Sequence, residues 1–561
     1  MKKLIFSMLI IFLCLTSFTL ISCGGEDDTT TAEPPADYGI TYELNGGTNS
    51  VENPSGYSEG DTVVLSAPVK ENYFFKGWYT DSSFTNQITE IKDKAENITL
   101  YAKWVPIVTY DISYQLNGGT NSIKNPDTYK TGEIITLDYP EKADYMFAGW
   151  FTDAALTTEI KEIKDKEENL TLYAKWILLD EVFEFDLSNG EYIVDDFINN
   201  VSTVIIPSIY NSLPVTGISD FAFSFKDSPE RIVIPDSIIS IGHHSFYKCE
   251  SLEYITLPAS VVSIGRSSFS ECYALKEIGV DPNNKYYKSI DGILYSIDGK
   301  TLVAYPNGND GETYAIPNGT ENVEAGAFIF NAYLKSVIIP NTVKVIGPSA
   351  FYKCSSLENI IIPDSVTQIG NSAFYECTSL KGLTLSNGVE VIGYDAFAKC
   401  SSLENLVIPG SVKKLGLRVF SDCISLKSVT IGDGVPTIES LAFANCISLT
   451  SVAIPDSVTT IKLQAFENCT SLKSITIPDS VTAIETGVFN RCTSLESITI
   501  PDSVATVEAG SFNFCTNLTV YCEAESKPEG WSNLWDNDVK EVVWGHKEGN
   551  KNLLRRTLLL A

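Results

Sequence analysis

The chain has 561 residues, which is too long for one compact core and predicts several domains. It carries 71 acidic and 40 basic side chains, giving a formal net charge of -31 at pH 7. So acidic a chain is not expected to bind nucleic acid, whose phosphates need a basic face, nor to dock electrostatically on anionic lipid. The charges are spread along the chain, as in a well-solvated protein surface.

Residues 1–22 have the pattern of an export signal. Lys2 and Lys3 precede an apolar run from Leu4 to Leu15, and small residues lead up to Cys23. The apolar run is too short to span a bilayer comfortably. We therefore predict a signal peptide over residues 1–22.

The end of this segment, Leu20-Ile21-Ser22-Cys23, resembles the lipobox of bacterial lipoproteins, with Ile21 in place of the usual small residue. The resemblance implies that Cys23 is acylated after cleavage and anchors the protein in a membrane, with the outer membrane as the expected location. Residues 23–39 are rich in acidic, threonine and proline residues, as expected of a flexible tether. The alternative is an ordinary signal peptide with an incidental cysteine.

Residues 40–106 and 107–178 are two copies of one module. The motif Gly77-Trp78-Tyr79-Thr80-Asp81 returns 72 residues later as Gly149-Trp150-Phe151-Thr152-Asp153, and Leu-Tyr-Ala-Lys-Trp ends both copies. Apolar and polar residues alternate around Asn-Gly and Gly-Gly turns, which predicts small β domains. A short helix or turn is predicted near residues 88–96.

These motifs resemble the internalin-type B repeat, also called the Listeria-Bacteroides repeat, over nearly all of both modules. The resemblance implies two small β-grasp-like domains of a bacterial surface protein. Trp78 and Trp150 are assigned to the core, because a domain of about 65 residues needs its few large side chains inside. A binding platform made by these indoles is the alternative.

A 23-residue repeat fills the chain from about Phe223 to Cys515. Its consensus is Cys-x-Ser-Leu-x-x-Ile-x-Ile-Pro-Asp-Ser-Val-x-x-Ile-x-x-x-Ala-Phe-x-x, and phenylalanine keeps the step from Phe328 to Phe512 without a gap. A fixed short period predicts a solenoid in which each repeat buries its apolar side chains only against its neighbours. About twelve rungs are expected.

The consensus predicts two extended pieces per rung. Leu-x-x-Ile-x-Ile fits one strand, Pro-Asp-Ser ends it, and Ser-Val-x-x-Ile fits a second short strand before a tight turn around Ala-Phe. Strands stacked in register form parallel sheets. The predicted fold class is therefore mostly β: a leucine-rich-repeat solenoid of 23-residue repeats, preceded by two β-grasp-like modules.

The repeat closely resembles the BspA-like leucine-rich repeats of bacterial surface proteins. The resemblance implies a solenoid over residues 180–522 with a hairpin insertion near 281–313, and a C-terminal cap over 523–545. Caps are expected because an open end would expose strand edges and core. Residues 546–561 are expected to be a disordered tail.

A column of cysteines keeps the 23-residue step. Its members are Cys354, Cys377, Cys400, Cys423, Cys446, Cys469, Cys492 and Cys515. Stacked strands bring Cα atoms within disulfide range, yet side chains in register point the same way, and two rungs carry Asn331 and Lys226 instead. We expect buried free thiols, with disulfides and a metal site as the alternatives. Cys522 falls outside the column.

No catalytic residues are predicted. The chain has three histidines, and no glycine-rich phosphate loop, nucleophile elbow or metalloprotease helix is present. The adjacent His243 and His244 fit a solvated turn better than a ligand set. Aspartates recur after proline, from Asp236 to Asp502, and fit a solvated turn better than a weak calcium site. We expect no enzyme activity, no cofactor and no metal.

The outward positions of the longer strand form the predicted binding face. They fall in two columns of small and β-branched residues with few charges, and such a strip can accept a protein by shape. The candidate residues are Ser336, Asn359, Thr384, Asn405, Thr430, Ser474, Thr476, Ser497 and Thr499.

These features lead to the hypothesis of a lipid-anchored surface protein that binds other proteins through its solenoid. The BspA-like resemblance implies adhesion to host matrix or plasma proteins such as fibronectin and fibrinogen, and it alone suggests these partners. The alternatives are carbohydrate binding, by the module indoles or by Trp531, Trp535 and Trp544 of the cap, and a structural role in coaggregation.

Overall fold

The computed structural model describes residues 37–546, so the predicted signal, Cys23 and all but the first residue of the predicted tail lie outside the described residues. Within the described part the chain is almost entirely β-structure, with one 3-10 helix, η2 (Leu179–Glu181). Contacts group the chain into two compact units. One is built mainly from the first module, and the other from most of the second module and the solenoid.

The first module is a five-stranded sheet in the order β2-β1-β7-β4-β5. Its strands are β1 (Tyr38–Glu43), β2 (Gly56–Tyr57), β4 (Tyr73–Tyr79), β5 (Gln87–Ile88) and β7 (Ile98–Pro106). β1 is parallel to β7, and β4 is antiparallel to it. A separate ribbon pairs β3 (Val63–Val64) with β6 (Glu90–Ile91). Of the short helix or turn predicted near residues 88–96, no helix forms: β5 and β6 flank a bend, and further bends follow β6.

The second module repeats this plan with the order β12-β11-β14-β8-β9. Its strands are β8 (Thr109–Gln115), β9 (Thr128–Lys130), β11 (Tyr145–Phe151), β12 (Glu159–Ile160) and β14 (Leu170–Leu178). β10 (Ile135–Thr136) pairs with β13 (Glu162–Ile163). Both N-terminal repeats are therefore strand-rich, as their alternating sequence predicts.

The module tryptophans lie in the cores. Trp78 and Trp150 are 2% and 3% exposed. Their indole N–H groups donate to the carbonyl oxygens of Ser66 and Asp138, at 3.0 and 3.2 Å. The predicted core role is confirmed, because a buried indole whose N–H is already paired has neither face nor donor free for a ligand.

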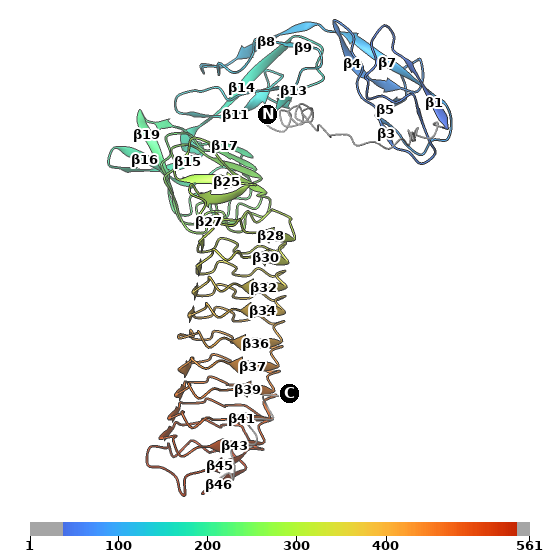
Figure 1. Ribbon diagram of the computed structural model, residues 1–561. Helices are drawn as coiled ribbons and strands as arrows, with labels where there is room; N and C mark the ends of the chain where they lie inside the picture. The colour runs from blue at the N-terminus through green and yellow to red at the C-terminus, as the bar shows by residue number, and fades with distance from the viewer. Residues whose placement is uncertain (1–36, 547–561) are drawn as a thin grey trace, which may run out of the picture. The chain divides into compact units, whose positions relative to one another are not determined.

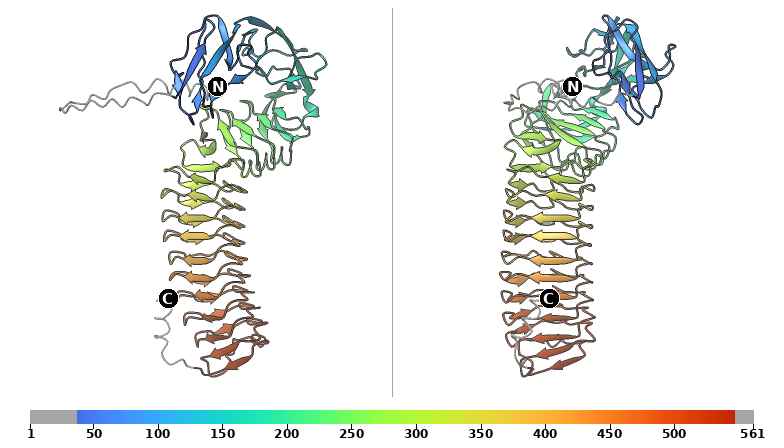
Figure 2. Two further views of the ribbon diagram at one scale, coloured as in Figure 1. Left: turned by 90° about the vertical axis from the view of Figure 1, so that its right-hand side faces the viewer. Right: turned by 45° about the vertical axis from the view of Figure 1, so that its right-hand side comes forward.

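The solenoid has two strands in most rungs, stacked one above the other (Figures 1 and 2). The longer strands, named here the long-strand face, are β17 (Thr203–Ile205), β20 (Arg231–Val233), β22 (Tyr254–Leu257), β24 (Glu277–Val280), β28 (Thr313–Ala315), β30 (Ser336–Ile338), β32 (Asn359–Ile362), β34 (Gly382–Leu385), β36 (Asn405–Ile408), β37 (Ser428–Ile431), β39 (Ser451–Ala453), β41 (Ser474–Thr476), β43 (Ser497–Ile500), β45 (Thr519–Cys522) and β46 (Glu541–Val543). They form four consecutive sheets, and within each sheet neighbours pair in parallel and in register, as Ile361 does with Thr384. The predicted parallel solenoid is confirmed.

A second set of parallel sheets carries the shorter strand of each rung. It contains β19 (Leu213–Ile218), β21 (Ser240–Ile241), β23 (Ser263–Ile264), β29 (Asn322–Val323), β31 (Val345–Ile346), β33 (Gln368–Ile369), β35 (Val391–Ile392), β38 (Thr437–Ile438), β40 (Thr460–Ile461), β42 (Ala483–Ile484) and β44 (Thr506–Val507). A hairpin of β15 (Phe183–Ser188) and β16 (Glu191–Phe197) starts this set, and β18 (Ile209–Tyr210) pairs with β19.

The turn around each phenylalanine is the most regular part of the solenoid. Phe351 and Phe374 stack with ring centroids 4.9 Å apart and planes 5° apart, and the column continues to Phe512. Ser349 and Lys353, on either side of Phe351, have left-handed backbone φ values of 53° and 56°. This conformation is strained for residues other than glycine. Backbone bonds to the next rung offset the strain, such as Phe351 N to the Ala373 carbonyl at 2.7 Å.

A second hairpin interrupts the stack of rungs. It is formed by β25 (Tyr287–Ile290), β26 (Ile293–Ser296) and β27 (Thr301–Ala304). β27 pairs in parallel with β29 and so starts the next series of rungs. The hydrophobic core is split at this point into two clusters, one on each side of the hairpin.

The C-terminal end of the stack is covered by indoles. Trp535 packs its edge against Phe512 with ring centroids 5.9 Å apart, and Trp531 packs against Trp535 at 4.9 Å. Trp531 and Trp535 are buried, whereas Trp544 is half-buried. The two buried indoles close the last rung and leave no open face for stacking on a sugar.

The column cysteines are buried free thiols, and Cys249, Cys272 and Cys522 are buried and free as well. Each column thiol donates to the carbonyl oxygen of the phenylalanine 26 residues earlier, as Cys400 does to Phe374 at 3.2 Å. Burial raises the pKa of the Cys400 thiol to about 12. No disulfide links cysteines of residues 37–546, and no group of three metal-binding side chains gathers there.

We expect these thiols to be unreactive in the folded protein. The thiolate is the reactive form, and burial both raises the thiol pKa and excludes the reagent. The protein from Gly24 onward should therefore give almost no absorbance change with a chromogenic disulfide reagent at pH 8. In denaturant the same reagent should react with all eleven buried cysteines. Rapid reaction of several thiols without denaturant would contradict the burial.

Candidate binding face

The alternation of the long strands places every second side chain outside the solenoid. In β32 the side chains of Ile360 and Ile362 are buried, and those of Asn359 and Ile361 point outward. Asn359 lies opposite Gly382 and Ile361 opposite Thr384, so residues 23 apart line up across the rungs. The outer surface of the long strands therefore consists of straight columns, and each column holds the residues at one position of the 23-residue repeat.

Most of the predicted candidates are exposed on this face. Asn359, Thr384, Asn405, Thr430, Ser474, Thr476 and Ser497 are exposed, whereas Ser336 and Thr499 are half-buried. One of them also contacts a neighbour in its column: the side-chain oxygen of Asn405 accepts a hydrogen bond from Ser428 at 2.7 Å. The structure thus brings the candidates together in two adjacent columns.

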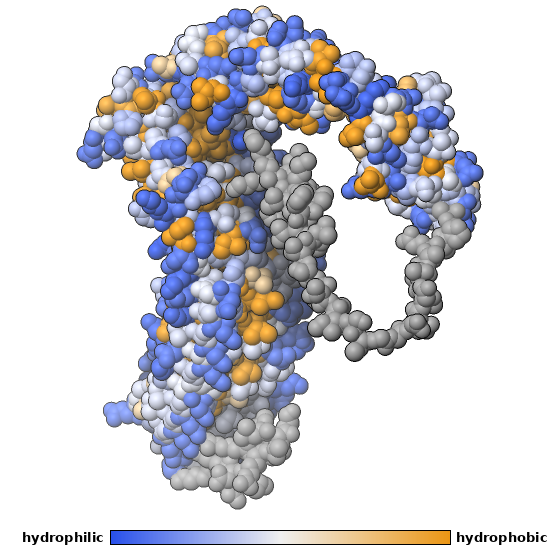
Figure 3. Space-filling model, turned by 45° about the horizontal axis from the view of Figure 1, so that its top comes forward, coloured by the Kyte–Doolittle hydropathy of each residue, from blue (hydrophilic) through white to orange (hydrophobic). Residues whose placement is uncertain are grey.

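Three aliphatic side chains of the face are also strongly exposed, in the same column as Thr384. Ile338, Ile361 and Val407 are 62%, 65% and 62% exposed, and Thr384 occupies the rung between Ile361 and Val407. We call these three residues the aliphatic column. Apolar side chains gathered over adjacent rungs of an otherwise polar surface are typical of interaction sites. Figure 3 shows apolar patches on the solenoid between polar regions.

A column of alternating charge borders the long-strand face. It consists of Glu312, Lys335, Glu358, Lys381, Glu404 and Lys427. Lys335 pairs with Glu312 at 2.6 Å, and Lys427 with Glu404 at 2.8 Å. The hydrogen bond with Lys427 lowers the pKa of the Glu404 carboxyl, and that with Glu312 raises the pKa of Lys335. Charges that pair with one another carry little net field, so this border neither attracts nor repels a partner strongly.

The recurring aspartates, which follow a proline or, in the case of Asp433, a glycine, lie at the other end of the long strands. Asp364, Asp433 and Asp502 are exposed, as expected of a turn. Within residues 37–546 they form no group of three His, Cys, Asp or Glu side chains that could hold a metal ion. These aspartates add negative charge to the rim of the face.

A second exposed apolar column lies at the phenylalanine turns, on a different side of each rung. Its members are Tyr394, Leu417 and Leu463. These three residues lie in turns rather than in strands, and Ser440 separates Leu417 from Leu463 along the column. This column offers a matched control for the long-strand face.

The two adjacent histidines lie in one turn and play different roles. The ring of His244 stacks on Phe221 with centroids 5.1 Å apart, and burial lowers its pKa. His243 Nδ1 accepts a hydrogen bond from the backbone N–H of Arg266 at 2.8 Å. The pair therefore shapes the turn, and among residues 37–546 no side-chain carboxylate or hydroxyl forms a hydrogen bond with either ring.

Among residues 37–546, no helix has both the length and the apolar composition that a membrane crossing requires. The described fold and its face thus define a repeat scaffold: a parallel β-solenoid whose outer strand surface is organised in columns.

The sequence profile of the BspA type leucine rich repeat region matches residues 199–291, 304–427 and 390–519, which together exceed half of the chain. The protein belongs to the BspA-type leucine-rich-repeat family. The Listeria-Bacteroides repeat domain matches residues 38–103 and 110–175. Both expected resemblances are confirmed.

Relatives share short segments with the chain. A protein of Evansella cellulosilytica that carries the description membrane protein is 34% identical over 180 residues, which are 30% of this chain and 26% of that protein. Internalin H of Listeria monocytogenes is 31% identical over 115 residues, or 20% of each chain. The matched segments thus span about a quarter or less of these relatives.

Solved structures of bacterial repeat proteins are also similar. A leucine-rich repeat protein from Bacteroides ovatus is 28% identical with a TM-score of 0.42, covering 61% of this chain and 93% of that chain. A leucine rich cell surface protein from Faecalibacterium prausnitzii is 24% identical with a TM-score of 0.39, covering 66% and 97%.

Proposed function

We propose that this protein is a non-enzymatic cell-surface lipoprotein that binds a host extracellular protein, such as fibronectin or fibrinogen, through the long-strand face of its solenoid. Residues 180–522 present the face and 523–545 cap it. Residues 40–106 and 107–178 serve as a stalk. The aliphatic column carries this proposal, because it is the most exposed apolar feature of the sheet surface.

Burial of the aliphatic column supplies the binding energy in this proposal. Fully burying an isoleucine or valine side chain contributes roughly 1.5–3 kcal/mol, so covering three that are about two-thirds exposed contributes about 3–6 kcal/mol in total. The neighbouring Ser, Asn and Thr side chains are small and uncharged, so a partner can approach closely without removing water from charges. The self-paired border charges add no barrier.

The proposed location rests on the sequence and the relatives. Cys23 is the proposed lipid-attachment residue, and the lipobox resemblance supports an anchor at the bacterial cell surface, in the outer membrane. The description of one relative as a membrane protein, and the internalin name of another, also favour a surface location. The names fibronectin and fibrinogen come from the family resemblance alone.

The test is binding of the protein from Gly24 onward to immobilised fibronectin, fibrinogen and a glycan panel, measured by surface plasmon resonance. Saturable binding to a host protein, with none to glycans, is the expected result. Binding to glycans alone would favour the carbohydrate alternative, and association only with a second copy of the chain would favour coaggregation. Either outcome would contradict the proposal.

A further inference from the structure

The stacked ring column of the solenoid is interrupted once among the described residues, at the second hairpin. Phe246 stacks on Phe269 with ring centroids 5.6 Å apart, and Tyr305 stacks on Phe328 at 5.1 Å. Phe269 and Tyr305 are the next neighbours in the column, but no ring stacking joins them. The aromatic packing that connects each rung to the next is therefore missing at this boundary.

The hydrogen bonds that run along the turns stop at the same place. In the preceding rung, the N–H of Phe246 donates to the Ser268 carbonyl and the Phe246 carbonyl accepts from the Cys272 thiol, both at 3.0 Å. The N–H and the carbonyl of Phe269 have no such partner among residues 37–546. On the other side of the boundary, Asn331 occupies the cysteine position, and its buried side-chain amide N–H group has no acceptor within the same residues. Unpaired buried polar groups cost free energy, so this contact is weaker than one between regular rungs.

Both sheets and the hydrophobic core also divide here. β24 and β23 are the last strands of their sheets, and new sheets begin at β28 and β25. The long-strand sheets end again after β34 and after β39. There the ring column continues: Phe397 lies 5.0 Å from the preceding ring, and Phe466 lies 5.4 Å from its own. Within residues 183–545, the hairpin is thus the one place where the ring column, the turn hydrogen bonds and the core all end together.

A smaller set of contacts connects the two sides of the boundary. The Ile278 N–H donates to the Gly292 carbonyl, and the Gly308 N–H donates to the Leu275 carbonyl, both at 2.8 Å. The Leu294 side chain packs into the core of the preceding rungs. A contact between regular rungs has two parallel sheets, the turn hydrogen bonds and a stacked ring pair instead.

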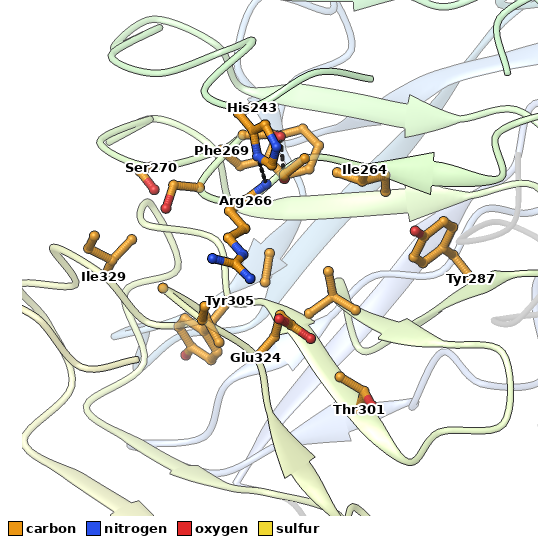
Figure 4. A pocket seen from close by; sticks show the side chains of 18 of the residues that line it. His243, Ile264, Arg266, Phe269, Ser270, Tyr287, Thr301, Tyr305, Glu324 and Ile329 are labelled. Carbon is orange, nitrogen blue, oxygen red and sulfur yellow. Dashed lines mark hydrogen bonds between the residues drawn. The ribbon is translucent and has the colours of Figure 1, made fainter. Parts of the chain in front are cut away.

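A pocket of about 440 Å³ lies between the two sides. Figure 4 shows Arg266 on one wall and Glu324 on the other, and both residues are exposed. The rungs touch beside the pocket, where a Cβ atom added to Gly326 would lie 2.8 Å from Ser267 Oγ. Water reaches charged side chains inside this contact, so separating the two sides exposes less new apolar surface than separating two regular rungs.

We propose that the solenoid opens at this boundary, and that residues 183–280 and 287–545 unfold as two separate blocks, the N-terminal block first. The stability of a solenoid is approximately a sum over its repeats and the interfaces between neighbours, so cooperativity ends at a weak interface. The N-terminal block has fewer rungs, whereas the C-terminal block contains the aliphatic column and the tryptophan cap. Unfolding of the N-terminal block lengthens the connection between the modules and the aliphatic column while that column stays folded. This inference does not rest on the function proposed for the column.

Amide hydrogen exchange across a guanidinium chloride series, read by mass spectrometry of peptic fragments, tests the proposal on the protein from Gly24 onward. Fragments from residues 223–278 should lose protection at a midpoint at least about 0.5 M below that of fragments from residues 328–520. A common midpoint for both sets of fragments would overturn the proposal, and so would earlier loss of protection in the C-terminal block.

Matched core truncations in the two blocks provide the second measurement. Phe246 and Phe420 are both fully buried, and each lies between two stacked rings, at 5.3 and 5.6 Å and at 5.4 and 5.6 Å. Phe246→Ala should lower the midpoint of the 223–278 fragments by at least about 0.5 M, or leave them unprotected throughout, and keep that of the 328–520 fragments within about 0.1 M. Phe420→Ala should shift only the 328–520 fragments. A shift of both sets in either variant would mean that the boundary transmits stability between the blocks, and would overturn the proposal.

Discussion

Replacing Ile338, Ile361 and Val407 together with lysine should weaken binding to the host protein at least about 100-fold and leave the melting temperature nearly unchanged. The three side chains contribute about 3–6 kcal/mol when covered, and each factor of ten corresponds to about 1.4 kcal/mol. Their outward orientation means that the core loses no contact when they are replaced. The dissociation constant and the thermal midpoint are measured on the same preparation.

The matched control places three lysines on the second exposed column, at Tyr394, Leu417 and Leu463. It makes the same change in net charge and also replaces three exposed apolar side chains. Binding of this control should stay within about threefold of the unchanged protein, because the altered residues lie at the turns. Equal loss of binding in both triple variants would mean that the long-strand face is not the site.

Truncating one phenylalanine of the stacked column should destabilise the solenoid more than any surface change. Phe420 is fully buried and lies between Phe397 and Phe443, with ring centroids 5.4 and 5.6 Å away. Phe420→Ala should lower the free energy of unfolding by about 3–5 kcal/mol, because the neighbouring rungs are held by backbone bonds and cannot close the cavity. Chemical denaturation followed by far-ultraviolet circular dichroism measures the effect.

Phe514→Ala is the control for this prediction. Phe514 is exposed, and its ring contacts the Arg491 guanidinium at 5.5 Å from the centroid. This substitution should lower the free energy of unfolding by less than about 1 kcal/mol, which is the usual strength of an exposed cation–π contact. An equal decrease in the free energy of unfolding for both variants would show that the aromatic column does not hold the rungs together.

The repeat allowed most of the fold to be predicted from the sequence. A period of 23 residues fixes which side chains recur, and an apolar side chain such as Phe420 or Cys400 that recurs in most rungs is expected to face the shared core. The two strands per rung follow from the same pattern. In the modules, the size of the domain was enough to place Trp78 inside.

Features that depend on the gaps between repeats could not be predicted. The segment near residues 88–96 was predicted only as a short helix or turn, because the sequence does not show that β3 is the partner with which β6 pairs. The hairpin of β25, β26 and β27 interrupts the period, so the period does not predict it, and only the family resemblance indicated an insertion near residues 281–313. The outward direction of Ile338, Ile361 and Val407 was by contrast predictable, because the alternation of the long strand places them in one column with Thr384; the structure adds that each is about two-thirds exposed.

In the proposed function the host protein contacts the long-strand face. The most direct test places a photo-crosslinking amino acid at Thr384, between Ile361 and Val407, or at Gln368 in β33 of the other sheet. Both positions are exposed. Irradiation of the complex should join the partner to position 384 and leave position 368 unreacted. Crosslinking from position 368 alone would contradict the account and place the partner on the opposite side of the rungs.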